Sequence, residues 1–169
     1  MLKEIILKGN EHFYKGEYNE AIEWYDKALQ IDSCNFEVWF NKGYALGELR
    51  KYNEAIEFHD KALKIDPNYA EAWTNKGYAL MELGKYEEAI KYLDKALQID
   101  PNYPLSWYNR ACSKVKMGYI EEALEDLKKA IELGKEEYIE SAKKDDDFET
   151  IRNDDRFKKL IALFNHLFL

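Results

Sequence analysis

The sequence repeats at an interval of 34 residues, and this period constrains the fold more than any other feature of the chain. The phrase NKGYAL occurs at residues 41–46 and again at 75–80, each time two residues after a tryptophan. A weaker copy, NRACSK, begins at Asn109 and also follows a tryptophan. A segment of 34 residues cannot cover its own apolar face, so successive copies must stack on one another.

Shifting the chain by this interval aligns four repeats without a gap, at 2–35, 36–69, 70–103 and 104–137. One column of the alignment holds small residues, two hold alanine, and one holds tryptophan in three of the repeats. In that order the columns are Gly9, Gly43, Gly77 and Ala111; Ala21, Ala55, Ala89 and Ala123; Ala28, Ala62, Ala96 and Ala130; and Trp39, Trp73 and Trp107.

Each repeat fits two amphipathic helices. In the third repeat, Trp73 and Gly77 lie on one apolar stripe, and Gly84 then offers a left-handed helix end. A second stripe runs through residues 89–97 and ends before Pro101. Helices that approach closely need small side chains where they cross, so we expect the small-residue column to meet the first alanine column.

These columns resemble those of the tetratricopeptide repeat, a helix–turn–helix unit of the same length. The resemblance covers residues 2–137 and implies an all-α fold, a right-handed solenoid of antiparallel helix pairs. It also implies a concave groove, lined by the first helix of each repeat, that usually receives a peptide. The positions that match the family pattern are Trp73, Gly77, Ala89, Ala96 and Pro101.

The chain departs from the family pattern in two columns. Arg50 stands where the other repeats have glycine, so we expect the second repeat to turn with some strain or with a different turn. A basic residue precedes each small residue, where the family often has leucine. We expect the stems of these side chains to lie along apolar surface while their charged heads stay in water. The basic residues are Lys8, Lys42, Lys76 and Arg110.

The register is lost after residue 137, and we predict that 138–169 form a helical extension packed on the same domain. EEYIESAKK continues a helix, and the acidic segment after it forms a turn with Asp154 or Asp155 as the next N-cap. The final helix carries a core-facing stripe and should cap the apolar flank of the fourth repeat. The members of this stripe are Phe157, Leu160, Ile161, Phe164 and Phe168. Leu163 and Leu167 widen the apolar surface, so the alternative to a cap is that this helix forms a homodimer contact or occupies a groove.

The overall composition excludes several classes of protein. The 169 residues carry a net charge of −8, which argues against nucleic acid as the main partner because phosphate binding needs clustered lysine and arginine. No run of 18 apolar residues is present, so we expect no membrane span. The two cysteines suggest no disulfide framework, and the first residues lack the apolar core of a signal peptide, so we expect a cytoplasmic protein.

Catalytic and metal-binding patterns are not recognisable in the sequence. The three histidines are scattered, and His59 occupies a column otherwise held by large packing residues. The acidic run at 145–147 lacks the glycine turn of a calcium-binding loop. There is no glycine-rich phosphate loop and no nucleophile motif. We therefore expect no enzyme activity, no cofactor and no metal.

The groove implied by the resemblance can be located by helical geometry. We predict that the face opposite the small residues carries an asparagine ladder with aromatic neighbours, which offers amide donors and acceptors to a peptide backbone. The alternative is that these asparagines belong to the repeat consensus and only bond between helices. The predicted groove residues are Asn10, Phe40, Asn41, Tyr44, Asn75, Tyr78, Tyr108 and Asn109, with Glu37, Glu48, Glu71 and Glu82 at the margins.

One subfamily of these repeats binds chaperone C-termini through two asparagines and three cations. Asn10 and Asn41 match the asparagine positions, but Ile6, Glu71 and Asn75 occupy the cation positions, so the resemblance implies no such clamp. The acidic margins favour a neutral or basic segment with apolar side chains. We therefore predict a non-enzymatic adaptor that binds a peptide or protein segment, with a self-associating structural module as the alternative.

Overall fold

A computed structural model describes residues 1–165 of the chain, with side chains up to Phe164. These residues form ten α-helices and one 3₁₀ helix without any strand, which confirms the predicted all-α class. The elements are α1 (Leu2–Tyr14), α2 (Tyr18–Ile31), α3 (Phe36–Glu48), α4 (Tyr52–Ile65), α5 (Ala70–Glu82), α6 (Tyr86–Ile99), α7 (Pro104–Lys116), α8 (Ile120–Gly134), α9 (Glu136–Lys144), η1 (Asp146–Ile151) and α10 (Asp155–Asn165).

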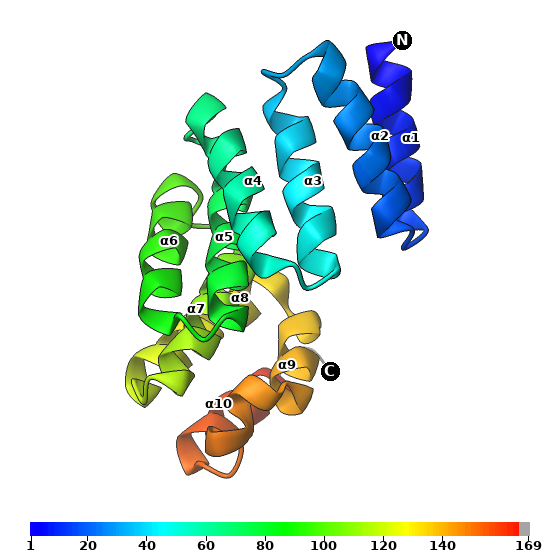
Figure 1. Ribbon diagram of the computed structural model, residues 1–169. Helices are drawn as coiled ribbons and strands as arrows, with labels where there is room; N and C mark the ends of the chain where they lie inside the picture. Colours follow the sequence, from blue (N-terminus) through cyan, green and yellow to red (C-terminus); the bar gives the residue numbers. More distant parts are fainter. Residues whose placement is uncertain (166–169) are drawn as a thin grey trace. The chain divides into compact units, whose positions relative to one another are not determined.

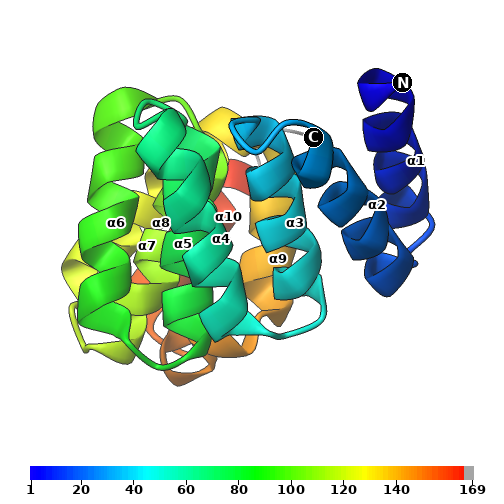
Figure 2. The same ribbon diagram turned by 45° about the horizontal axis from the view of Figure 1, so that its top comes forward.

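The helices reproduce the period of the sequence. The first helices of the repeats begin at residues 2, 36, 70 and 104, and the second helices begin at residues 18, 52, 86 and 120. The chain divides into two compact lobes, Met1–Leu83 and Gly84–Leu169. This boundary falls inside the third repeat, and the predicted division at residue 137 remains a prediction. In the N-terminal lobe, α1 to α5 lie side by side in chain order (Figures 1 and 2).

A left-handed residue ends the first helix of each repeat. The glycines that take this role have φ values between 73° and 80°, as expected for Gly84, and Arg50 adopts φ 59° at the same place. The amide of Arg50 donates to the carbonyl of Gly47 at 2.8 Å, and Lys51 donates to Leu46 at 2.9 Å. The same pair of bonds follows α1, so the second repeat keeps the common turn and accepts the strain of a side chain in the left-handed region.

The tryptophan column stabilises the connections that precede α3, α5 and α7. The indole of Trp73 donates to the carbonyl of Pro67 at 2.8 Å, and the carboxylate of Asp66 accepts from the amide of Asn68 at 3.0 Å. These bonds close the turn on itself and on the helix that follows it. Trp39 with Ser33, Trp107 with Pro101, Asp32 with Cys34 and Asp100 with Asn102 make the same bonds.

Basic residues next to the small column form ion pairs with the preceding helix. Lys42 pairs with Asp26, and Lys76 pairs with Asp60, each at 2.5 Å. Lys76 is only 7% exposed. The expectation that these charged heads stay in water is therefore wrong for the second, third and fourth repeats, because an aspartate one helix earlier receives each head. In the fourth repeat, Arg110 reaches Asp94 at 2.5 Å and Asp126 at 2.7 Å.

The small residues leave room for the rings of side chains on the second helix of the same repeat. A Cβ atom added at Gly9 would lie 2.6 Å from the ring of Tyr25, and one at Gly43 would lie 2.8 Å from the ring of His59. A side chain at these glycines would thus clash first with the large residue four positions after the first alanine column, while Gly43 and Ala55 line one small cavity, and the expected contact of the two columns remains a prediction. The alanines are nonetheless fully buried, as at Ala21 and Ala55.

The C-terminal extension differs from the prediction in two places. Lys135 has φ 57° and separates α9 from α8, so the helix does not simply continue. The acidic segment forms the 3₁₀ helix η1, which buries Phe148 and Ile151. Asp154 is the N-cap of α10, as predicted, and accepts from the amide of Arg156 at 2.8 Å.

The last helix packs on α8 and α9, which agrees with its predicted role as a cap. Three members of its stripe, Phe157, Ile161 and Phe164, are at most 8% exposed. Leu163 is 53% exposed. The predicted contributions of Leu167 and Phe168 lie outside the described residues.

Candidate functional site

The N-terminal lobe contains a cavity of about 350 Å³ between α1, α2, α3 and the start of α5. This volume is at the lower end of the usual range for ligand pockets. Five of the lining residues were predicted for the groove, namely Asn10, Phe40, Asn41, Tyr44 and Glu71, and the other four are Phe13, Tyr14, Tyr25 and Tyr69.

Two asparagines and a tyrosine form the polar part of this pocket. The hydroxyl of Tyr25 donates to Asn10 Oδ1 at 2.8 Å, and Asn41 Nδ2 donates to the same oxygen at 3.2 Å. Burial raises the pKa of Tyr25, so its hydroxyl stays protonated as a donor. With its oxygen engaged twice, Asn10 retains its NH₂ group for a ligand, and Asn41 retains its carbonyl oxygen. A donor and an acceptor are thus present in the lining of the same cavity.

The asparagine ladder is therefore partly structural. The bond between Asn41 and Asn10 joins α3 to α1, as the alternative hypothesis required. Both amides nevertheless line the cavity. The two roles are compatible, because the interhelical bond fixes the orientation of the amides that face the cavity.

Aromatic rings form the walls of the pocket. The ring centroids of Phe13 and Tyr44 are 5.0 Å apart, and those of Phe40 and Tyr69 are 4.8 Å apart. The hydroxyl of Tyr69 donates to Glu71 at 2.9 Å, which places a carboxylate at the edge of the wall. Tyr44 is 42% exposed, and its pKa is raised by partial burial and then by the negative charges of Glu48 and Glu71.

The remaining predicted residues of the N-terminal lobe lie outside this pocket. Asn75, Tyr78 and Glu48 line a second cavity of about 20 Å³ together with His59. Tyr78 is 36% exposed and its ring lies 6.2 Å from that of Tyr52. Glu37 is exposed, and Glu82 accepts a hydrogen bond from Tyr52 at 2.8 Å.

His59 is a buried, neutral side chain beneath the second cavity. It is 1% exposed, and Nδ1 has no hydrogen-bond partner within the described structure. Burial, followed by the positive charge of Lys76, lowers its pKa from 6.5 to about 3. Its ring lies 5.6 Å from Phe40 and over Gly43, which agrees with the packing role expected from its column.

Tyr108 and Asn109, both predicted for the groove, are buried, and the C-terminal extension contacts Tyr108. They are 7% and 4% exposed. The ring of Tyr108 contacts those of Tyr138 and Phe148 at centroid distances of 5.2 and 5.5 Å, and its hydroxyl donates to Asp145 at 2.8 Å. These two residues cannot meet a partner at this surface, because the chain itself turns back onto α7.

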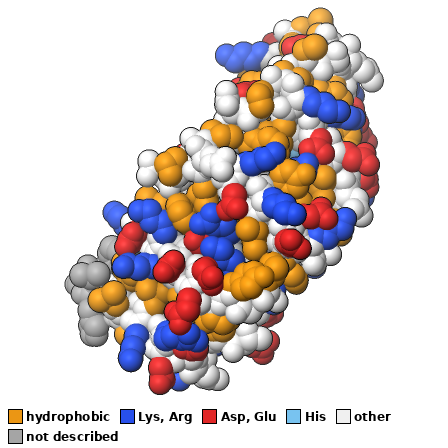
Figure 3. Space-filling model, turned by 90° about the vertical axis from the view of Figure 1, so that its left-hand side faces the viewer, with side chains coloured by type: hydrophobic (Ala, Val, Ile, Leu, Met, Phe, Trp, Pro, Cys, Tyr) orange, Lys and Arg blue, Asp and Glu red, His pale blue; other side chains and the backbone are white. Residues whose placement is uncertain are grey.

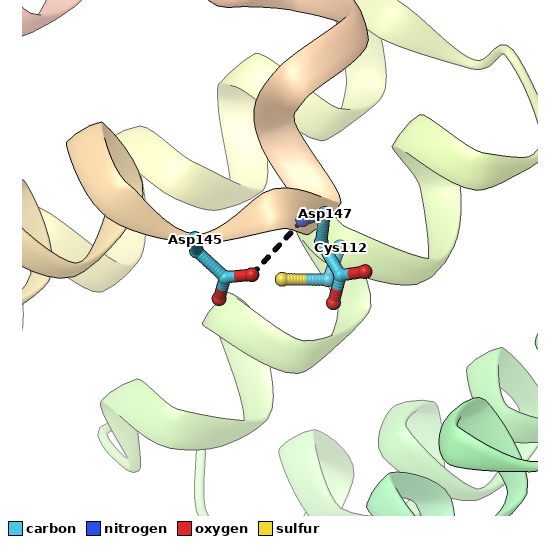
Figure 4. Close-up of side chains that lie close together, drawn as sticks. All are labelled: Cys112, Asp145 and Asp147. Carbon is cyan, nitrogen blue, oxygen red and sulfur yellow. Dashed lines mark hydrogen bonds between the residues drawn. The ribbon is translucent and has the colours of Figure 1, made fainter.

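The same contact brings Cys112 beside Asp145 and Asp147 (Figure 4). The thiol and the two carboxylates offer three donor atoms within 4.8 Å of one another. Asp147 already pairs with Lys116 at 3.0 Å, and its amide donates to Asp145 at 2.9 Å. Burial raises the pKa of the Cys112 thiol well above its ordinary value, so the thiol stays protonated. The cluster fastens η1 to α7, and sequence spacing did not reveal it.

The surface shows no separation of charge on the face drawn in Figure 3, where basic and acidic side chains are intermixed with hydrophobic ones. Across the part of the chain with described structure, none of the helices combines the length and hydropathy needed to cross a bilayer.

Family models of the tetratricopeptide repeat match almost the whole helical array. One model matches residues 36–69 and 70–103, a second matches 9–50, and a third matches 105–144. The third match extends past the end of the fourth predicted repeat and includes α9. No curated protein sequence matches the chain.

Solved structures with the same fold include a MamA protein, at 25% identity and a TM-score of 0.75, with 95% of this chain and 90% of that chain covered. The tetratricopeptide domain of Arabidopsis OM64 has 25% identity and a TM-score of 0.65, covering 67% of this chain and 93% of its own. YrrB, described as having an unusual peptide-binding site, has 22% identity and a TM-score of 0.68, covering 92% and 80%. This last likeness shows the fold alone.

Proposed function

The chain belongs to the tetratricopeptide-repeat family, and from this premise we propose that it is a non-enzymatic adaptor that binds an extended peptide or protein segment in the pocket of its N-terminal lobe. Proteins with this repeat present their first helices to partners, and α1, α3 and α5 all contribute to this pocket. We place the adaptor in the cytoplasm, since both cysteines are free.

The observation that carries the proposal is the oriented pair of amides. Because Tyr25 and Asn41 both donate to Asn10 Oδ1, the NH₂ group of Asn10 and the oxygen of Asn41 remain as donor and acceptor in one cavity, and we propose that they bind one peptide unit. Such a donor–acceptor pair binds backbone irrespective of side chain. The aromatic walls add apolar contact for the flanking side chains of the segment, as aromatic residues do at binding surfaces.

A selected peptide tests this proposal. Peptides displayed on phage would be selected on the full chain, and the strongest binder would be labelled and titrated by fluorescence anisotropy. We expect Asn41→Ala with Tyr44→Ala to weaken its binding at least tenfold while the circular dichroism spectrum and melting temperature stay near those of the parent. Tyr119→Ala with Asn102→Ala, an exposed pair in the other lobe, is the matched control.

The proposal would be refuted by a selected peptide that binds the pocket variant and the parent equally well. Asn75→Ala with Tyr78→Ala is informative in the same titration. We propose that the bound segment continues along α5, where Tyr78 is partly exposed, and this second double variant should then also weaken binding.

Self-association is the alternative function, and the exposed side chain of Leu163 on α10 favours it. Light scattering across a dilution series separates the two proposals. A mass that stays at that of one chain at all concentrations excludes self-association, and Leu163→Ser should abolish any dimer that forms.

A further inference from the structure

We propose, resting on the peptide-binding function above, that the pocket of the N-terminal lobe receives a lysine or arginine side chain of the bound segment. The cation would lie against the exposed ring of Tyr44, beside Phe13 and Phe40 in the pocket wall, and would be neutralised by Glu71. The inference depends on three observations: aromatic rings that line the pocket without a cation over them, an acidic side chain without an ion pair at its edge, and the position of both beside the two amides.

The aromatic faces of the pocket differ from those elsewhere in the same lobe. Lys8 and Lys27 lie over the ring of Trp24 at 4.7 and 4.1 Å from its centroid, and Lys42 and Lys61 lie over Phe58 at 4.3 and 4.5 Å. Outside the pocket, Trp24 and Phe58 are thus covered by cations of the same lobe. Within the described residues, no cation lies over the pocket rings Phe13, Phe40 and Tyr44. A cation placed within about 6 Å of such a ring is attracted by its quadrupole.

The charge at the pocket is negative and has no internal counter-ion. Glu71 is the one charged residue among those that line it, and neither lysine nor arginine belongs to the lining. Glu71 accepts a hydrogen bond from Tyr69 but forms no ion pair within the described structure. Glu48 lies near enough for its charge to raise the pKa of Tyr44 together with Glu71. A bound cation would thus meet the carboxylate of Glu71, with the negative charge of Glu48 outside the lining but near Tyr44.

The third observation concerns position. Asn41, which offers its carbonyl oxygen to a peptide group, belongs to the same cavity as Tyr44 and Glu71. A segment whose backbone is held at the asparagines therefore has a side chain within reach of the rings. A long, flexible stem suits this arrangement, because lysine and arginine place apolar methylenes along the rings and carry their charge to the acidic edge. A glutamate at that point would meet repulsion, and a short side chain would not reach.

Three defined peptides test the inference. Each would be an N-acetylated, C-amidated pentapeptide with the order serine, leucine, variable residue, leucine, serine, and the variable residue would be lysine, norleucine or glutamate. Norleucine matches the lysine stem without the charge. Binding would be measured from shifts of the backbone amide signals of the ¹⁵N-labelled full chain, and signals from α1 and α3 would report the pocket.

We expect the lysine peptide to bind about tenfold tighter than the norleucine peptide, with the glutamate peptide weakest. Glu71→Gln, which retains an oxygen for Tyr69, should reduce this preference to about threefold or less. Tyr44→Leu should weaken the lysine peptide more than the norleucine peptide. Glu37→Gln, which removes an exposed charge outside the pocket, should leave the order unchanged.

The possible failures are distinguishable. Equal binding of the lysine and norleucine peptides at the pocket would overturn the cation preference and leave the proposed groove intact. A preference for lysine that persists unchanged in Glu71→Gln and Tyr44→Leu would place the cation elsewhere. If none of the three peptides shifted the signals of α1 and α3, both the groove and the cation site would be refuted.

Discussion

Replacement of His59 by leucine should remove a large part of the acid sensitivity of the fold. Leucine is the residue that the third and fourth repeats place in the same column, at Leu93 and Leu127, and both are fully buried. The substitution therefore introduces a side chain that this architecture already accommodates. It also removes Nδ1, a buried nitrogen without a hydrogen-bond partner in the described structure.

The magnitude follows from the two protonation equilibria of the imidazole. Its pKa is about 3 in the folded chain and 6.5 when unfolded, because burial penalises the charged ring. Between these values the unfolded state binds a proton that the folded state does not, so stability falls as the pH falls. Each unit of pH in this window costs about 1.4 kcal/mol, and the loss between about pH 7.5 and pH 4.5 is about 2.5–3 kcal/mol.

Urea unfolding, followed by circular dichroism at several pH values, measures this difference. Between about pH 7.5 and pH 4.5, the free energy of unfolding of the parent should fall by about 2.5 kcal/mol more than that of His59→Leu. Above about pH 7, the free energy of unfolding should change with pH equally in both proteins. His12→Gln, which removes an imidazole paired with Glu17 at the surface, is the control for loss of a histidine. Parallel pH profiles for the parent and His59→Leu would refute the argument that a neutral ring is buried there.

Two other substitutions test features of the helix array. Arg50→Gly should raise the free energy of unfolding by about 0.5–1 kcal/mol, because the left-handed conformation strains arginine but not glycine, and the gain is offset in part by the flexibility of glycine when unfolded. Thermal melts measure it, and a lower melting temperature would contradict the assigned turn. Arg110→Met should destabilise the chain by about 3 kcal/mol, since it leaves the buried carboxylate of Asp126 with Lys114 alone. Lys76→Met should lower the free energy of unfolding by only about 1 kcal/mol, because the carboxylate of Asp60 is 42% exposed and water can replace the ammonium. Urea unfolding measures both variants, and a larger loss for Lys76→Met than for Arg110→Met would disprove this explanation.

The period of the sequence was sufficient to predict the helices of the repeats. A glycine in the left-handed region and an aspartate turn recur at fixed offsets, and both act through local backbone geometry that a single repeat specifies. Position within the repeat also indicated five of the nine residues that line the pocket. Two of the other four escaped notice for physical reasons. Tyr25 enters from a second helix, and Tyr69 precedes α5 as its N-cap, so neither lies on the face used for the prediction.

Non-local contacts account for what the sequence did not indicate. Lys76 and Asp60 are 16 residues apart on neighbouring helices, so no spacing within one helix connects them. For this reason we expected from the sequence that the ammonium group of Lys76 stays in water. The burial of Tyr108 required the knowledge that η1 returns to α7, which depends on Phe148 and Tyr138 finding a common apolar surface. A segment with three consecutive aspartates gave no indication of that, since it buries only two apolar side chains, Phe148 and Ile151.

The return of η1 onto α7 has a consequence for how such a chain can grow. A tandem block that follows α8 would have to replace the contacts of Tyr108 and Cys112 with η1, and would expose Phe148 in doing so. A block inserted ahead of residue 104 leaves those contacts untouched. Lengthening by whole repeats is therefore compatible with these contacts only when the added repeats lie ahead of α7.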